Sequence, residues 1–276
     1  MSPEQIEEIE AELLLEAVYR RYGYDFRSYT RASMRRRIKA LQLDSGFDRI
    51  ADMIRPVLHD PAFLTRLVSR FTISVTEHFR DPPVFLAMRE KVVPVLRTWP
   101  HIKIWHAGCA SGEEVYSLAI VLKEEGLYDR ATIYATDLNP QALETARDGI
   151  YGLDKLQDAT RNYQLAGGQR SFSEYYHARY EAAAMDAGLR ERMVFSTHSL
   201  AADGVFGEMH LVLCRNVLIY FNRELQDRAL GLFRDSLVHG GFLCLGMKED
   251  LQFSAANGDF QDVDRTARIF KRKALL

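Results

Sequence analysis

Two glycines and two acids stand at a spacing that suits binding of a small ligand. Gly108 and Gly112 lie in a short loop that follows an apolar run, and Glu113 and Glu114 come directly after it. Glycine lets a backbone turn sharply and approach a ligand closely. The N–H groups that begin the following helix point at whatever lies above such a loop. A loop for phosphate would keep this helix end free of acids or add a lysine, so these acids favour a ligand with hydroxyl groups or positive charge.

A further acid lies where nucleotide-binding folds bind a ribose. Asp137 ends the next apolar run, about 25 residues beyond the glycine loop, and an acid there accepts hydrogen bonds from ribose hydroxyls. Alternatively, Asp137 or Asn139 caps the helix that begins at Pro140, and the glycines of the loop serve only to let the helix pack on the strand. The G-x-G-x-x-G pattern of dinucleotide sites is absent. We therefore expect a nucleoside without pyrophosphate, which favours S-adenosylmethionine (SAM) over NAD, since its sulfonium and amino groups are positive.

A polar residue also follows the apolar run 210–214. Asn216 is expected at the carboxyl end of that strand, where its amide can bond to an adenine or to the methionine part of the cofactor. Tyr220 follows within reach of the same crevice. The alternatives are a turn residue for Asn216 and a half-buried core aromatic for Tyr220.

Alternating apolar and amphipathic runs predict the strands and helices that position these residues. Beyond residue 100 the pattern predicts a doubly wound parallel α/β sheet, in which ligands lie at the carboxyl ends of the strands. Residues 1–72 show helical spacing alone and predict a small helical domain before a second domain at 73–276, in which about 151–192 form an insertion with a small β hairpin. The predicted strands are 102–107, 132–136, 193–196, 209–214, 242–246 and 266–273, and the predicted helices include 29–41, 47–58, 61–68, 114–125, 140–148 and 223–237.

Composition excludes several classes of protein. The 276 residues carry a net charge of −2, which gives no reason to expect nucleic-acid or membrane binding. The three cysteines are isolated, which argues against disulfides and against a zinc site. The acidic N-terminus has no apolar signal segment, and no apolar run reaches the ~18 residues needed to span a bilayer. We expect a cytoplasmic protein without a metal.

Four sequence blocks together resemble the CheR family of chemoreceptor glutamate methyltransferases. The resemblance runs from about Tyr22 to Lys273, and the last two blocks are the most specific. The blocks are FTISVTEHFR at 71–80, similar to N-x-T-x-F-F-R; IWHAGCASGEEVYSL at 104–118, similar to W-S-A-G-C-S-T-G-E-E-P-Y-S-L; 135–150, similar to A-T-D-I-x-x-x-A-L-x-x-A-R-x-G-x-Y; and CRNVLIYF at 214–221, nearly identical to the family signature.

The resemblance implies a Rossmann-like SAM-dependent methyltransferase that leaves S-adenosylhomocysteine (SAH) as product. It implies catalytic roles for Arg80 and Tyr220, and it makes Glu113 a cofactor contact and Glu114 only a charge at the helix N-terminus. Ser74 and Ser199 stand where the family has asparagine, and residues 246–249 read G-M-K-E where the family has G-H-S-E. The implied cofactor-binding residues are Ser74, Thr76, Arg80, Ala107, Glu113, Asp137, Leu138, Ser199, Leu200, Asn216 and Val217.

The implied reaction needs no general base. A glutamate side chain is ionised at pH 7, so the enzyme has only to align it with the methyl carbon. Arg80 can hold a carboxylate by charge-assisted hydrogen bonds, and Tyr220 can donate another. The alternative for Arg80 is a structural ion pair with Asp81 or Glu77.

One predicted helix is strongly basic although the whole chain is slightly acidic. Arg31, Arg35, Arg36 and Arg37 crowd it. Such a run is usually a solvated face, but the resemblance implies that it binds the partner, the acidic cytoplasmic helical bundle of a methyl-accepting chemoreceptor. We expect a monomer. The alternatives are a signalling adaptor that binds SAM or SAH without catalysis, and a methyltransferase for a different carboxylate or for RNA.

Overall fold

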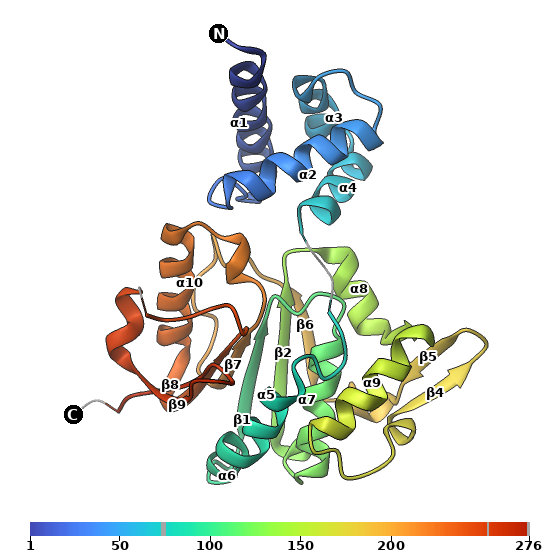
Figure 1. The fold of residues 1–276 in the computed structure, drawn as a ribbon, viewed down its shortest axis with the longest axis vertical. Coiled ribbons are helices and arrows are strands. Elements are labelled where there is room, and N and C mark those ends of the chain that lie inside the picture. Colours follow the sequence, from blue (N-terminus) through green and yellow to red (C-terminus); the bar gives the residue numbers. More distant parts are fainter. Residues whose placement is uncertain (73–75, 253, 275–276) are drawn as a thin grey trace.

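A helical unit at the N-terminus stands over the edge of an α/β domain (Figure 1). The structure is a computed structural model and describes residues 1–72, 76–252 and 254–274. The first unit contains α1 (Pro3–Tyr22), α2 (Arg31–Asp44), α3 (Ile54–His59) and α4 (Pro61–Phe71).

The local sequence fixes where these helices begin. At α1, Ser2 and Gln5 form a capping box, in which each side chain bonds to the backbone of the other. The N-cap of α4 is Asp60, which accepts a hydrogen bond from the N–H of Ala62 at 2.9 Å. The helix predicted at 47–58 is shorter, because Asp52 bonds to the N–H of Arg49 and starts a 3-10 turn ahead of α3.

The main sheet has seven strands in the order β6-β2-β1-β7-β8-β10-β9. The first five are parallel, as predicted. The direction in which successive strands are added to the sheet reverses beside β1, which lies between β2 and β7. The strands are β1 (Ile102–Ala107), β2 (Ala131–Asp137), β6 (Met193–Thr197), β7 (Met209–Cys214), β8 (Leu237–Leu245), β9 (Phe260–Asp264) and β10 (Ile269–Arg272).

The prediction of a wholly parallel sheet was wrong at one edge. β10, the strand predicted at 266–273, runs antiparallel to β8, and β9 was not predicted. The chain between Asp264 and Ile269 is too short for the crossover that parallel strands require, so β9 and β10 pair as a hairpin.

Helices cover both faces of the sheet. Side chains along β7 alternate between two apolar clusters, Leu211 and Leu213 in one and Val212 and Cys214 in the other. One cluster includes residues of α7 (Glu113–Glu124), and the other includes residues of α10 (Arg223–Ser236). Outside the insertion, the other α-helices of the domain among the described residues are α5 (Pro82–Ala87), α6 (Val93–Leu96) and α8 (Pro140–Asp148).

The insertion contains the predicted hairpin and more. The hairpin is β4 (Tyr176–Arg179) with β5 (Ala182–Met185), and β3 (Ile150–Gly152) pairs with β5 to complete a three-stranded antiparallel sheet. The helix α9 (Asp154–Leu165) was not predicted, although Leu156, Ala159 and Tyr163 recur at helical spacing and are buried.

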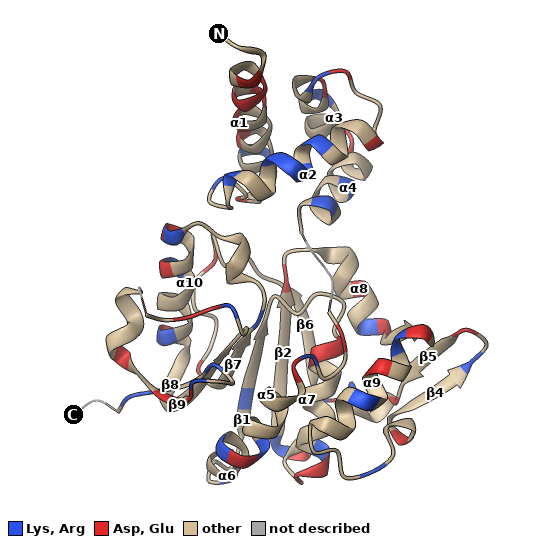
Figure 2. Cartoon of the chain, in the orientation of Figure 1, with Lys and Arg blue, Asp and Glu red and all other residues tan. Residues whose placement is uncertain are grey.

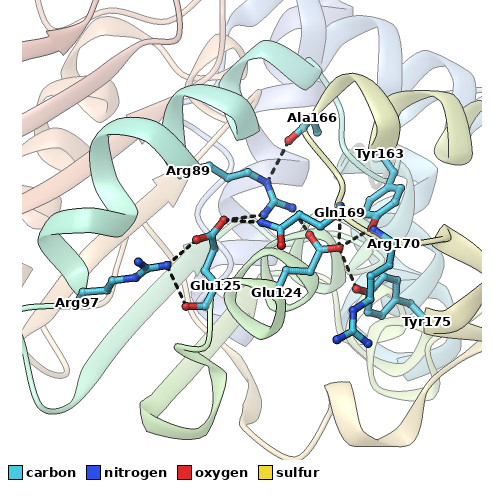
Figure 3. A network of polar contacts seen from close by, with 9 residues as sticks. All are labelled: Arg89, Arg97, Glu124, Glu125, Tyr163, Ala166, Gln169, Arg170 and Tyr175. Atoms are coloured by element: carbon cyan, nitrogen blue, oxygen red, sulfur yellow. Dashed lines mark hydrogen bonds and ion pairs between the residues drawn. The ribbon is translucent and has the colours of Figure 1, made fainter.

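A buried polar network joins the insertion to the rest of the domain (Figure 3). The Glu124 carboxylate at the end of α7 accepts hydrogen bonds from Arg89 and Tyr163, and from Tyr175 at 2.9 Å. Burial acts to raise the pKa of Glu124, but the hydrogen bonds from Tyr163 and Arg89 outweigh it and lower the pKa. The network thus holds the insertion against α7 through a charged carboxylate.

Candidate active site

A cavity lies at the carboxyl ends of β1, β2 and β7, at the predicted reversal of strand order. The helical domain closes its other side, because Tyr29, Arg37 and Phe71 line it together with residues of the sheet. Within the described ranges, no group of three metal-ligating side chains is found, and no helix is both long and apolar enough to cross a membrane.

The structure brings most of the predicted site residues to this cavity. Ala107 is buried at the end of β1 and Glu113 at the start of α7, and neither lines the cavity. Arg31, Arg35 and Arg36 are exposed on α2, and Ser74 lies outside the described residues. The predicted residues on the cavity wall are Arg37, Thr76, Arg80, Asp137, Leu138, Ser199, Leu200, Asn216, Val217 and Tyr220.

The glycine loop closes tightly over the end of β2. The N–H groups of Gly108 and Cys109 both donate to the Thr136 carbonyl, at 2.8 and 2.9 Å. Gly108 has φ +79°, and a Cβ added there would lie 2.5 Å from a methyl carbon of Val217. Only glycine therefore suits this position, and the backbone itself forms part of the cavity wall.

Asp137 lies at the end of β2 and is not the cap of α8. Its two carboxylate oxygens accept hydrogen bonds from the N–H groups of Ala110, at 2.8 Å, and Asn139, at 2.9 Å. The cap is Asn139, whose side chain accepts from Gln141 at 3.0 Å. Burial raises the pKa of Asp137, against the backbone hydrogen bonds that lower it. Each oxygen keeps a lone pair, which suits the predicted ribose hydroxyls.

The two acids after the glycine loop differ sharply in their surroundings. Glu114 lines the cavity and pairs with Arg215 at 2.6 Å, whereas Glu113 accepts a hydrogen bond from Ser111 at 2.7 Å and lies near Lys155. Burial acts to raise the pKa of Glu114, but Arg215 and His106 together outweigh it and lower the pKa to about 2. The cofactor role predicted for Glu113 has no support in this geometry.

Arg215, which the sequence analysis gave no role, organises the chain beside Arg80. Its guanidinium donates to Asp81 at 2.7 Å and to the Arg80 carbonyl at 3.2 Å, in addition to Glu114. Asp81 is thus already paired, and the Arg80 guanidinium has no hydrogen-bond or ion-pair partner among the described residues. The alternative of an Arg80–Asp81 pair is wrong, and the adjacency of Arg215 to Asn216 was the only available signal.

Two of the residues that line the cavity, Asn216 and Arg37, have polar atoms without a full set of partners among the described residues. The Asn216 amide oxygen and one terminal nitrogen of Arg37 are both buried, and neither makes a hydrogen bond with a described residue. The other terminal nitrogen of Arg37 donates to the Phe71 carbonyl. The Arg37 guanidinium lies over the Tyr220 ring, 4.9 Å from its centre. Unpaired buried polar atoms are costly, so their presence fits a ligand with complementary groups.

Comparisons with known proteins identify the family of the chain. The all-alpha domain of CheR methyltransferases matches residues 9–72, and their SAM-binding domain matches 74–269. "Putative methyltransferase Cher3" of Pseudomonas putida is 53% identical over 274 residues, which are 99% of this chain and 100% of that one. The chemotaxis protein methyltransferases of Listeria innocua and Vibrio parahaemolyticus are each 29% identical, over 85% and 79% of this chain and 87% and 80% of their own. The chain belongs to the CheR family of SAM-dependent methyltransferases.

Proposed function

We propose that this methyltransferase transfers the methyl group of SAM to glutamate side chains in the cytoplasmic helical bundle of a chemoreceptor, forming glutamyl methyl esters. The observation that supports this most is the meeting of two domains at one cavity. Arg37 comes from the basic helix α2, and Arg80 and Tyr220 come from the α/β domain, and all three line the cavity. The cavity therefore offers cationic and hydroxyl donors suited to a carboxylate substrate.

The cavity residues divide into those suited to the cofactor and those suited to the substrate. Asp137 would accept from the ribose hydroxyls, and Asn216 would use its unpaired amide oxygen. Leu138 and Leu200 contribute apolar side chains to the wall of the cavity. When bound, the cofactor supplies a methyl group on a positively charged sulfur, which is an activated electrophile.

The residues of the chain then have to place the incoming carboxylate. A glutamate is ionised at pH 7 and is itself the nucleophile, so orientation supplies most of the catalysis. Arg80 and Tyr220 would each donate a hydrogen bond to it. Hydrogen bonds that are too strong would lower the nucleophilicity of the carboxylate. Arg80 and Tyr220 are therefore expected to orient the carboxylate more than to neutralise its charge.

The test is transfer of labelled methyl to purified receptor cytoplasmic fragments, with SAH binding measured by calorimetry. Base-labile label on receptor glutamates, together with SAH binding, is the expected result. SAH binding without transfer to any carboxylate would identify a signalling adaptor. Transfer to small carboxylic acids but not to receptor fragments would identify a different substrate and contradict the proposal.

The basic face of α2 is partly neutralised by the acidic helix beside it (Figure 2). Arg31 pairs with Glu8 at 2.9 Å, and Arg35 lies 3.9 Å from Glu7. Arg36 is exposed, and no ion pair joins it to any described residue. Of these exposed arginines, Arg36 therefore has the charge most available to an acidic partner.

We expect Arg36→Glu to weaken receptor methylation more than Arg35→Glu does. The reversed charge at Arg36 repels an acidic bundle directly, whereas the charge of Arg35 is partly offset by Glu7, which Arg35 shares with Lys39. The measurement is KM for receptor fragments at low and at physiological salt, where we expect a rise of about fivefold for Arg36→Glu that shrinks as salt is added. Equal KM values for the two variants at low salt would count against a substrate-binding role for this face.

A further inference from the structure

A buried carboxylate lies behind the loop that carries Asn216 and Tyr220. Glu249 is 4% exposed, and one of its oxygens accepts hydrogen bonds from the N–H groups of Gly246, at 2.6 Å, and Asn216, at 3.1 Å. Its other oxygen accepts from the N–H of Ile219 at 3.3 Å. No cationic side chain among the described residues pairs with it, so backbone N–H groups alone compensate its charge. A buried carboxylate held in this way fixes the backbone that surrounds it.

Glu249 binds a loop that has one residue in the left-handed region. Asn216 has φ +61°, a conformation that asparagine adopts more readily than other non-glycine residues. The bond from its N–H to Glu249 fixes that conformation while its amide oxygen stays buried without a partner at the cavity. The bond from Ile219 fixes the following 3-10 turn, Leu218–Tyr220, which carries Tyr220 to the same cavity.

The same loop also contacts the helical domain. The Tyr220 carbonyl accepts a hydrogen bond from the N–H of Thr30 at 2.9 Å, and Thr30 is the N-cap residue of α2. Next to it, the rings of Tyr29 and Phe221 lie 5.0 Å apart, and these residues form a β-bridge. One short loop thus bears a cofactor-facing amide and a candidate catalytic hydroxyl, and it contacts the start of the basic helix.

We propose that Glu249 is a positioning residue for methyl transfer. Its carboxylate sets the loop so that the Asn216 amide meets the cofactor and Tyr220 meets the substrate. The effect on the cofactor rests only on the SAM-binding assignment of the family. The effect on Tyr220 rests on the proposed function, so the two are measured separately.

The test compares two buried carboxylates by the same substitution in the full-length chain. Glu249→Gln keeps the size of the side chain but turns an NH2 group toward backbone donors. We expect the Kd for SAH to rise about tenfold or more, and kcat for receptor fragments at saturating SAM to fall as well. The control is Glu124→Gln, whose side chain is also buried, in the insertion network (Figure 3). We expect that variant to lower Tm and to leave the SAH Kd unchanged.

A second variant perturbs the same contact without removing the charge. A Cβ at Gly246 would lie 2.7 Å from both the Asn216 nitrogen and a Glu249 oxygen, so Gly246→Ala must displace them. We expect it to raise the SAH Kd in the same direction. The proposal would be overturned if the Tm of Glu249→Gln falls as it does in Glu124→Gln while its SAH affinity stays that of the wild type. If Glu249→Gln does not fold, native SAH affinity in Gly246→Ala overturns it. Because SAH binding needs no receptor, failure of the proposed substrate leaves this readout intact.

Discussion

Replacing Arg80 with alanine should lower kcat at saturating SAM by about 100-fold or more while leaving the protein folded. Arg80 lines the cavity, and its guanidinium has no hydrogen-bond or ion-pair partner among the described residues. Removing it therefore breaks no hydrogen bond or ion pair between the described residues. In the variant, the carboxylate of the substrate loses a charge-assisted hydrogen bond and is no longer aligned with the methyl group.

The surrounding backbone gives a reason to expect so large an effect. Phe79 and Asp81, on either side of Arg80, have φ +52° and +53°. Left-handed conformations at non-glycine residues are retained where the surrounding structure enforces them. Arg215 does so here by binding both the Arg80 carbonyl and the Asp81 carboxylate. The direction in which Arg80 leaves the chain is thus strongly constrained.

The measurement is single-turnover methyl transfer to receptor fragments, with Tm and SAH affinity as controls. Arg80→Lys keeps the charge but loses the planar fork of donors, so we expect a kcat between those of wild type and Arg80→Ala. If Arg80→Ala folds and turns over at the wild-type rate, Arg80 has no catalytic role.

The part of the cavity wall formed by the sheet was predictable because strand ends can be located from sequence. Each apolar run fixes the end of a parallel strand, and all such ends meet at one edge of the sheet. Asp137 and Asn216 both follow such runs, and both line the cavity. The helical domain was predictable for the same reason, since helical spacing of apolar residues needs no tertiary information.

The remainder depended on contacts that periodicity does not encode. Glu113 and Glu114 are neighbours in sequence, but successive helical residues point about 100° apart, and which one faces the cavity depends on where Arg215 lies. Arg37 belongs to a different domain, so its presence at the cavity follows from how α2 packs near Tyr220. A sequence alone supplies neither of these tertiary contacts.

The ion pair of Glu114 with Arg215 leads to the largest expected effect on stability. We expect Glu114→Gln to reduce the free energy of unfolding by about 3–5 kcal/mol, because it leaves the guanidinium of Arg215 buried with less compensation. Arg215 is 6% exposed and, among the residues that the structure describes, retains only Asp81 as a charged partner. The measurement is urea unfolding at pH 7, with Glu113→Gln as the neighbouring control. Glu113 has a pKa raised by burial, so removing its charge should cost far less.

The pH dependence of the same variant separates lost charge from lost packing. The pKa of Glu114 is lowered from 4.5 to about 2 in the folded protein. Its contribution is therefore complete above pH 4.5 and is lost as pH falls towards 2, where the folded carboxylate also takes up a proton. The difference in unfolding free energy between wild type and Glu114→Gln should shrink over that interval. A difference that stays constant from pH 7 to pH 3 would mean that Glu114 acts through its shape, and the electrostatic account of how Arg215 holds the Arg80 segment would then fail.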